Sequence, residues 1–333
     1  MKRIAINGMG RIGRLAFRLL YDHSEVEIVA INDLANNSVL AHLIQYDSVH
    51  GKWDRKVTYD SNNIIVDGKP IHCTEIADFN ALPWKERNID IVLECTGRAK
   101  TYDLAHGHIE AGAKKVIISA PADENTKTIV VGINDDTLIS DDIIISNASC
   151  TTNCLTPMIK ILEDNFGIEH AIMSTVHAYT GDQNLHDANH KTDLRRARAA
   201  AVNIVPTTTH ATESVETVLP EVKGKMIGGA MRVPVLDGSL TELYVQLSRP
   251  SNKESINKVF KNASENGRLK GILEYTDAPI VSSDIIGNPH SCIFDSELTS
   301  FVNENFCKIV GWYDNEFGYS NRLVELTLKV AKL

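Results

Sequence analysis

The feature that most constrains this chain is a glycine-rich turn between an apolar strand and an amphipathic helix. The turn, Gly8-Met9-Gly10-Arg11-Ile12-Gly13, follows the apolar run 3–7 directly and opens segment 11–21, whose apolar residues have helical spacing. Glycines permit a tight turn and the close approach of a pyrophosphate, and the helix N-terminus offers N–H groups and a positive dipole end. We therefore predict dinucleotide binding here rather than a merely structural turn.

A carboxylate at the end of the next strand indicates which dinucleotide is bound. Residues 26–32 predict a strand, and Asp33 follows it, 20 residues beyond Gly13. At this distance a carboxylate meets the 2′-hydroxyl of an adenosine ribose. Because a carboxylate repels a 2′-phosphate, Asp33 favours NAD over NADP.

The first half of the chain alternates strands with helices. Further strands are expected at 90–95, 115–119, 128–132 and 142–146, and a helix at 105–111 that Gly112 ends. This alternation predicts an α/β domain with a doubly wound parallel sheet that helices cover on both faces.

After Ser149 the pattern changes to longer strands with fewer helices between them. A helix is expected over 150–164, with Pro157 kinking it or shifting its start, and strands over 171–176, 225–233, 241–247 and 306–312. Segment 180–205 predicts an ordered loop beside a site, and 321–333 a helix. We expect a second domain of the α+β type with a mixed or antiparallel sheet.

The composition excludes several classes of protein. A length of 333 residues suggests two domains, and 43% hydrophobic with 23% charged residues is typical of soluble globular chains. A net charge of −9 disfavours nucleic acid or an anionic membrane as the principal ligand. No segment predicts a signal peptide or a membrane helix. Six scattered cysteines, without zinc spacing, indicate a reduced cytosolic protein with no metal site.

The motif Ser-Asn-Ala-Ser-Cys-Thr-Thr-Asn-Cys at 146–154 places a cysteine at the start of a helix. The helix dipole favours the thiolate of Cys150, and the hydroxyls of Ser149 and Thr151 stand beside it. This position alone leaves an inert buried thiol as an equal alternative. Cys154, one turn further on, is interpreted as a small buried hydrophobe.

A histidine at a strand end makes the catalytic interpretation of Cys150 preferable. His177 follows the apolar run 171–176 and starts a polar loop. A histidine in that position can pair with a thiolate and act as acid or base.

Arginines and threonines cluster in the second half of the chain. Arg195, Arg196 and Arg198 precede the threonines at 207–209, and Arg232 lies in an apolar strand. Guanidinium groups with clustered hydroxyls suit a phosphate, although a solvated basic face is the alternative for Arg195 and Arg198.

Together these motifs resemble the phosphorylating glyceraldehyde-3-phosphate dehydrogenase family. The resemblance extends along essentially the whole chain and rests on AINGMGRIGR, ECTG at 94–97, SNASCTTNC, TVHAYTGDQ, DLRRARAAA, RVP at 232–234 and WYDNEFGYSNR. It implies a cytoplasmic enzyme of glycolysis or gluconeogenesis. That enzyme uses NAD to oxidise and phosphorylate D-glyceraldehyde 3-phosphate to 1,3-bisphosphoglycerate through a cysteine thioester.

The resemblance also implies an architecture and a partner. It places a Rossmann-type NAD domain at 1–149 and a catalytic domain at 150–315. It has the C-terminal helix, 316–333, packing back on the first domain, and it implies a homotetramer.

Residue by residue, the resemblance assigns Cys150 as nucleophile and His177 as base. The cofactor positions it implies are Gly8, Gly10, Arg11, Ile12, Gly13, Asp33, Thr96, Ser119, Asn315 and Tyr319, with Asn315 on the nicotinamide carboxamide. Thr180 and Arg232 match the site of the substrate's C3 phosphate, and Ser149, Thr151, Arg196 and Thr209 that of the attacking phosphate. Asp182 and His210 are placed among the phosphate residues as well.

Several positions depart from the family pattern. His210 replaces a glycine, Ala77 an arginine, and Asn189 stands near a usual proline, while Val-Leu-Asp-Gly at 235–238 replaces Thr-Pro-Asn-Val.

Two alternative functions share features with this pattern. Erythrose-4-phosphate dehydrogenase shares the fold and the Cys/His pair but releases a free acid, and the retained Tyr179, Thr180 and threonines 207–209 disfavour it. A non-catalytic NAD-binding scaffold is disfavoured because Cys150 and His177 are both present.

Overall fold

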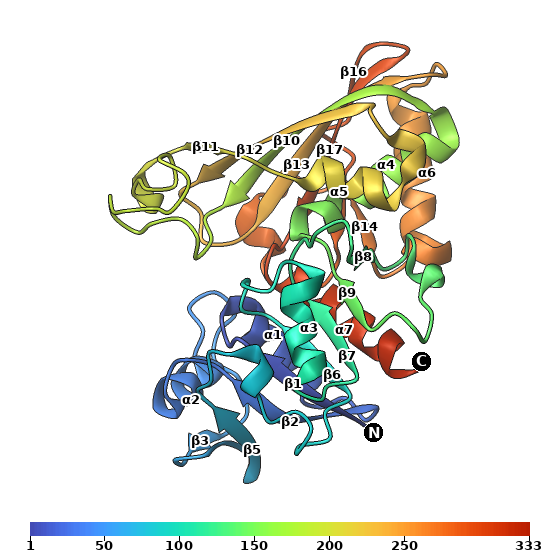
Figure 1. Cartoon of the computed structure of the whole chain (residues 1–333). Coiled ribbons are helices and arrows are strands. Elements are labelled where there is room, and N and C mark those ends of the chain that lie inside the picture. Colours follow the sequence, from blue (N-terminus) through green and yellow to red (C-terminus); the bar gives the residue numbers. More distant parts are fainter. The chain divides into compact units, whose positions relative to one another are not determined.

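A computed structural model describes residues 1–333 and divides the chain into two compact units. The first unit comprises Met1–Ser149 together with Ser320–Leu333, and the second comprises Cys150–Tyr319. Each unit is built around one β-sheet, and Figure 1 follows the chain through both. None of the helices combines the length and apolar character needed to cross a bilayer.

The first unit has a nine-stranded sheet in the order β3-β4-β5-β2-β1-β6-β7-β9-β8. Its strands are β1 (Lys2–Asn7), β2 (Val26–Asn32), β3 (Val57–Tyr59), β4 (Asn63–Val66), β5 (Lys69–Thr74), β6 (Ile91–Glu94), β7 (Lys115–Ile118), β8 (Lys127–Thr128) and β9 (Ile144–Ser146). All pairings from β5 to β8 are parallel, whereas β3-β4-β5 is an antiparallel meander. Strands β2 and β6 flank β1 on opposite sides, which creates a switch point at the carboxyl end of β1.

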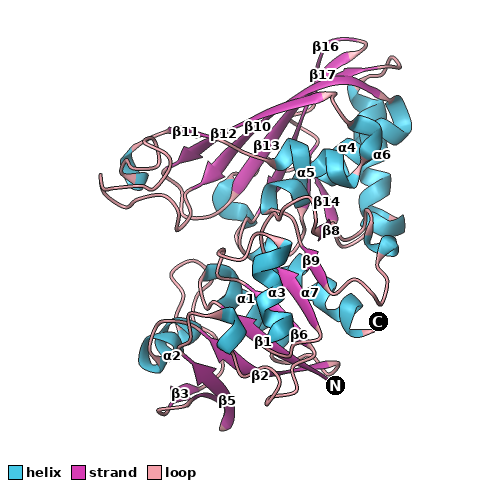
Figure 2. Cartoon of the chain, viewed as in Figure 1, coloured by secondary structure: helices cyan, strands magenta, loops and turns pink.

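Helices pack against this sheet, as Figure 2 shows. They are α1 (Arg11–Leu20), α2 (Asn37–Gln45), α3 (Tyr102–Glu110) and most of α7 (Phe317–Ala331). Helix α1 forms where the apolar spacing predicted it and buries Leu15, Ala16 and Leu20 of the expected apolar residues, together with Phe17. Beyond Ser320, α7 belongs to this unit, where Lys329 Nζ lies 2.8 Å from Asp135 Oδ2.

The second unit has an eight-stranded mixed sheet in the order β11-β12-β10-β13-β17-β15-β14, with β16 beside β17. Its strands are β10 (Ile168–Ala178), β11 (Val205–Thr207), β12 (Met226–Val233), β13 (Ser239–Leu247), β14 (Leu273–Thr276), β15 (Cys292–Asp295), β16 (Ser300–Asn303) and β17 (Phe306–Tyr313). Its helices are α4 (Cys150–Phe166), α5 (Ala211–Val218) and α6 (Lys253–Glu265). Helix α4 packs on the centre of the sheet, and the stacked rings of Phe260 and Phe294, with centroids 3.9 Å apart, fix α6 to β15.

One expectation about these elements is wrong. The strand expected at 128–132 ends at Thr128, because the side chain of Asn134 accepts the N–H of Val130 at 2.8 Å and holds the chain in a turn.

Of the two effects expected of Pro157, a shifted start of α4 does not occur, since the helix begins at Cys150 and continues through the proline to Phe166. Burial of both neighbours, Thr156 and Met158, holds the proline in the helix despite the backbone hydrogen bond that it removes.

Candidate active site

The glycine turn of the first unit is shaped by backbone packing. Gly8 has φ 92°, and a Cβ there would lie 2.6 Å from the backbone nitrogen of Thr96. A Cβ on Gly13 would collide with the carbonyl oxygen of Gly8. A Cβ on Gly10, in contrast, would meet nothing within 4 Å, so this glycine leaves an open surface in front of the α1 N-terminus. Such a surface fits the close approach of a pyrophosphate.

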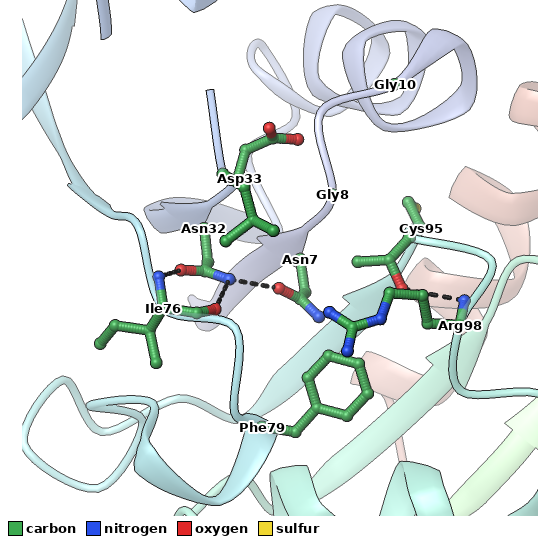
Figure 3. A pocket seen from close by; sticks show the side chains of 11 residues that line it. Asn7, Gly8, Gly10, Asn32, Asp33, Ile76, Phe79, Cys95 and Arg98 are labelled. Carbon is green, nitrogen blue, oxygen red and sulfur yellow. Dashed lines mark hydrogen bonds between the residues drawn. The ribbon is translucent and has the colours of Figure 1, made fainter. Parts of the chain in front are cut away.

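A cavity of about 260 Å³ opens at the carboxyl ends of β1, β2 and β6. Figure 3 shows its lining, which comprises Asn7, Gly8, Gly10, Asn32, Asp33, Leu34, Ile76, Phe79, Cys95, Thr96 and Arg98. Four residues predicted from the sequence to bind the cofactor therefore meet here: Gly8, Gly10, Asp33 and Thr96.

The carboxylate of Asp33 is held beside the glycine turn. Its Oδ2 accepts the N–H of Met9 at 2.6 Å, and its Oδ1 accepts the N–H of Ala35 at 2.9 Å. These two bonds point the carboxylate towards the turn, as Figure 3 shows. The position fits the hydroxyls of an adenosine ribose, so the residues present suit NAD.

An arginine and an aromatic ring complete this cavity, and sequence reasoning missed both. The guanidinium of Arg98 lies 5.3 Å from the centre of the Phe79 ring and donates to the carbonyl of Ala77 at 3.4 Å. In Figure 3 the Arg98 side chain reaches across the pocket from the turn after β6 to lie over Phe79. A cation on a ring face is a recurrent contact, but these two residues belong to separate connecting segments, so no local pattern indicates that they meet.

Other predicted cofactor residues of the first unit lie outside the cavity lining. The guanidinium of Arg11 binds the carboxylate of Asp47, at 2.5 Å and 3.0 Å, and Ile12 and Gly13 belong to the first turn of α1. Ser119 follows β7, where its N–H donates to the carbonyl of Glu94 at 3.0 Å.

In the second unit, Cys150 and His177 come together. Sγ of Cys150, at the first residue of α4, lies 3.4 Å from Nε2 of His177, near the end of β10. Nδ1 of His177 lies 2.6 Å from the carbonyl oxygen of Ala178. A carbonyl can only accept, so Nδ1 carries the proton and the Nε2 lone pair faces the sulfur. The imidazole is thus set as an acceptor for the thiol proton.

Burial keeps both groups neutral in this structure. It raises the pKa of Cys150 to about 11, although the N–H and hydroxyl of Thr151 act in the opposite direction. Together with the nearby Arg232, burial lowers the pKa of His177 to about 4, although the hydrogen bond to the Ala178 carbonyl acts in the opposite direction. The expectation that the helix start favours a standing thiolate is therefore wrong, because desolvation outweighs the helix. Nε2 of His177, 3.4 Å from the sulfur, is placed to receive the thiol proton.

A buried tyrosine supports the pair. The hydroxyl of Tyr313 lies 2.9 Å from Oγ1 of Thr151 and 2.8 Å from Oγ1 of Thr175, and its ring meets the His177 ring edge-on. Cys154 is fully buried, as predicted for a small hydrophobe.

A hydrogen-bond chain joins His177 to Asn315. The N–H of Ala178 donates to Oγ of Ser239 at 3.0 Å, and Oγ of Ser239 donates to Oδ1 of Asn315 at 2.6 Å. No local pattern indicates this role for Ser239, which follows a turn far from both partners along the chain. Tyr319, the other predicted cofactor residue of this unit, is buried.

The predicted phosphate residues form a cluster around one carboxylate. Arg232 lies beside His177 in the paired strands β10 and β12 and donates to Oγ1 of Thr180. Asp182 Oδ2 lies 2.5 Å from Nη1 of Arg196 and 4.0 Å from Nη2 of Arg232. Against the opposing effect of burial, these arginines hold the pKa of Asp182 below its usual value. Asp182 therefore positions the two cations.

The remaining predicted phosphate residues stand at the start of α5 and before α4. Oγ1 of Thr209 accepts the N–H of Ala211 at 3.2 Å. His210 is exposed and has φ −108°, so its backbone does not need a glycine. Ser149 is half-buried directly before the nucleophile. Arg198 forms an exposed pair with Asp187, in keeping with the solvated alternative.

The first sheet and its glycine turn, together with the thiol–imidazole pair of the second unit, are typical of an NAD-dependent dehydrogenase. Two family models match: "Glyceraldehyde 3-phosphate dehydrogenase, NAD binding domain" over residues 2–102 and "Glyceraldehyde 3-phosphate dehydrogenase, C-terminal domain" over residues 149–315. The chain belongs to the glyceraldehyde-3-phosphate dehydrogenase family.

Curated relatives agree with this assignment. A protein of Mycobacterium avium named glyceraldehyde-3-phosphate dehydrogenase is 52% identical over 337 residues, which cover 99% of this chain and 98% of the relative. Glyceraldehyde-3-phosphate dehydrogenase 2 of Streptomyces avermitilis is 52% identical over 331 residues, with the same coverage.

The Cys150–His177 geometry generates a test with iodoacetamide. His177→Asn should raise the pH at which Cys150 is alkylated, because the half-buried thiol loses the acceptor for its proton. Cys150→Ser should remove nearly all turnover and leave NAD binding intact. The measurements are alkylation rates against pH, mapped by mass spectrometry, and calorimetric NAD binding.

Cys154→Ser is the matched control, because it changes the same atom one helical turn away. Its effect on turnover should be far milder than that of Cys150→Ser. Alkylation that mapped to Cys154 or Cys307 and spared Cys150 would contradict the assignment.

Proposed function

We propose that this protein oxidises D-glyceraldehyde 3-phosphate with NAD and phosphorylates the product to 1,3-bisphosphoglycerate. The observation that carries the proposal is the Cys150–His177 pair with its fixed tautomer. The family and the NAD-binding domain support the substrate and the cofactor.

Cys150 and His177 carry the chemistry. As Sγ attacks the aldehyde carbon, its proton passes to Nε2, and the resulting imidazolium gives that proton to the oxygen of the thiohemiacetal. Nε2, neutral again, then takes the hydroxyl proton back while the carbon–oxygen double bond re-forms and the hydride leaves, and a thioester on Cys150 remains. NAD, when bound, supplies the hydride acceptor. Attack by inorganic phosphate breaks the carbon–sulfur bond, releases the acyl phosphate and returns Cys150 as the thiolate.

The two phosphate sites are assigned to Arg232 and Arg196 and to the hydroxyl groups near them. Arg232 and Thr180, already bonded to each other, would hold the C3 phosphate of the substrate. Arg196 and Thr209, with Ser149 and Thr151, would hold the attacking phosphate. Asp182 orients the two arginines and does not itself bind an anion.

The proposed cofactor residues form two sets, one for the adenosine and pyrophosphate part of NAD and one for its nicotinamide. Gly8, Gly10 and Asp33 would hold the pyrophosphate and the adenosine ribose. Asn315 would hold the nicotinamide carboxamide through its amide nitrogen, because its Oδ1 already accepts from Ser239.

The direct test is NADH absorbance with each candidate aldehyde. NADH should form from glyceraldehyde 3-phosphate only when inorganic phosphate is present. Faster, phosphate-independent turnover of erythrose 4-phosphate would overturn the proposal, and so would the absence of turnover with both aldehydes.

Asp33 should make the enzyme prefer NAD to NADP by about a hundredfold or more in kcat/KM. Its carboxylate is fixed by Met9 and Ala35 and cannot turn away from a 2′-phosphate without losing both bonds. Steady-state kinetics with both cofactors measures the ratio, and Asp33→Asn, which removes only the charge, is the control that should lower it. Comparable values of kcat/KM in the wild type would contradict the role of Asp33.

His210 should change how the enzyme uses phosphate. It follows Thr209 directly, and a protonated ring would attract the incoming anion, whereas the neutral ring would not. The KM for phosphate should therefore rise with pH more steeply than phosphate ionisation explains, and His210→Gly should remove the excess. Superimposable pH profiles of the two proteins would show that His210 does not reach the site.

The chain is also proposed to form a homotetramer. The outward face of the second sheet exposes apolar side chains in register: Ile172 pairs with Ile227 in the neighbouring strand, and they are 53% and 67% exposed. A second copy of the chain would cover such a face. A cytoplasmic location is proposed as well, since all six cysteines are free thiols.

Sedimentation velocity tests the assembly. The wild type should sediment as four chains, and Ile227→Lys should yield smaller species. Val302→Lys, at an 80% exposed apolar residue on β16, is the matched control and should leave the mass unchanged. A monomeric wild type, or equal behaviour of the two variants, would contradict the proposal.

A further inference from the structure

A buried carboxylate with four donors lies directly behind the dinucleotide cavity. Glu94, at the end of β6, is 1% exposed. Its Oε1 accepts the N–H of Thr96 at 2.9 Å and the Thr96 hydroxyl. Its Oε2 lies 2.5 Å from Nδ2 of Asn7 and 3.0 Å from Nε2 of His108.

Three of the four donors around Glu94 have a fixed direction. The indole N–H of Trp84 donates to Nδ1 of His108 at 3.0 Å, and an indole can only donate. Nδ1 of the fully buried His108 is therefore the acceptor, and its Nε2–H donates to Glu94. The backbone N–H of Thr96 and the Asn7 amide nitrogen are the other two fixed donors, and the carboxylate form satisfies all three.

The network continues from Asn7 into the second strand of the cavity. Nδ2 of Asn32 donates to Oδ1 of Asn7 at 2.7 Å and to the carbonyl of Ile76 at 2.9 Å. Oδ1 of Asn32 accepts the hydroxyl of Thr74 at 2.7 Å and the N–H of Ile76 at 2.9 Å. This second end is anchored by a backbone N–H, which also can only donate.

The members of the network adjoin the groups that would touch the cofactor. Asn7 immediately precedes Gly8, and Asn32 immediately precedes Asp33. Thr96 belongs to the turn against which Gly8 packs. Asn7, Asn32 and Thr96 themselves line the cavity, whereas Glu94, His108 and Trp84 do not.

We propose that Glu94 is a positioning residue for NAD. Its buried carboxylate fixes the donor and acceptor directions in the hydrogen-bond network, and this network holds the glycine turn and Asp33 in place. The inference rests on the proposed use of NAD. It concerns residues behind the cavity, to which no binding role has been given above.

A neutral amide cannot replace this carboxylate without conflict. In Glu94→Gln, one amide oxygen can still accept from Thr96, but the amide nitrogen then faces two donors, Asn7 and His108. If the Asn7 amide flips, its nitrogen faces the amide nitrogen of Asn32. If Asn32 flips as well, its nitrogen faces the N–H of Ile76, which can only donate. His108 cannot change tautomer while Trp84 donates to it. An unmade bond to a buried donor therefore persists.

The first measurement is the Kd of NAD by calorimetry, together with kcat at saturating NAD. Glu94→Gln should raise the Kd by about tenfold or more, while kcat changes by less than about threefold. Glu110→Gln is the matched control: Glu110 lies on α3 with His108, is 65% exposed and pairs with the His106 side chain. It should leave Kd and kcat unchanged.

A polarity-exchanged double variant separates positioning from a general loss of stability. In Asn7→Asp with Glu94→Gln, the carboxylate introduced at position 7 accepts from Asn32 and from the amide introduced at position 94, and it stands about 3.5 Å from Nε2 of His108, at the outer limit of a hydrogen bond. The carboxylate charge moves by one hydrogen-bond length, and fewer buried donors are left unpaired than in Glu94→Gln alone. The double variant should recover both thermal stability and most of the lost NAD affinity, even if Glu94→Gln alone fails to fold.

The outcomes distinguish the inference from the function. An unchanged Kd in Glu94→Gln overturns the positioning role, and so does a folded double variant that binds NAD no better than Glu94→Gln. A loss of kcat without a loss of affinity overturns it too. A wild-type chain that did not bind NAD would instead overturn the cofactor proposal itself, and the role of the network with it.

Discussion

The contact between the backbone of Gly8 and the turn after β6 is the constraint on which the first unit depends. A single added Cβ at Gly8 would lie 2.6 Å from the Thr96 nitrogen, so the carboxyl ends of β1 and β6 can meet only around a glycine. The close approach brings Asn7, Thr96 and Asp33 to one cavity and leaves the surface of Gly10 open. Sheet order, cavity and cofactor chemistry thus follow from the absence of one side chain.

In the second unit, the direction of the hydrogen bonds determines how the proposed site residues are oriented. The carbonyl of Ala178 determines which nitrogen of His177 is protonated, and the N–H of the same residue leads through Ser239 to Asn315. One residue's backbone therefore orients both the proposed base and the proposed carboxamide ligand. Burial raises the pKa of the Cys150 thiol and lowers that of the His177 imidazole, and both shifts favour the neutral pair.

Sequence reasoning succeeded where the determining signal was local. Apolar spacing predicted α1, glycine spacing placed the turn, and the strand–cysteine–helix pattern located Cys150. It failed where contacts between distant segments decide the outcome. The Arg98–Phe79 contact and the bridge from Ala178 through Ser239 to Asn315 join segments that are separate along the chain, and no local pattern indicates either contact. The sign of the Cys150 pKa shift was also missed, since burial is a property of the whole fold.

The carboxylate of Asp182 bears on how quickly anions exchange. Every nitrogen of the Arg196 guanidinium has a partner, with Nη1 on Asp182, Nε on Thr207 and Nη2 near Thr208. A phosphate bound at Arg196, as proposed, would compete with this internal carboxylate, which would pair with the arginine again when the phosphate leaves. Such competition would shorten the residence time of each anion, and fast exchange would suit a catalyst that both consumes and releases phosphorylated molecules.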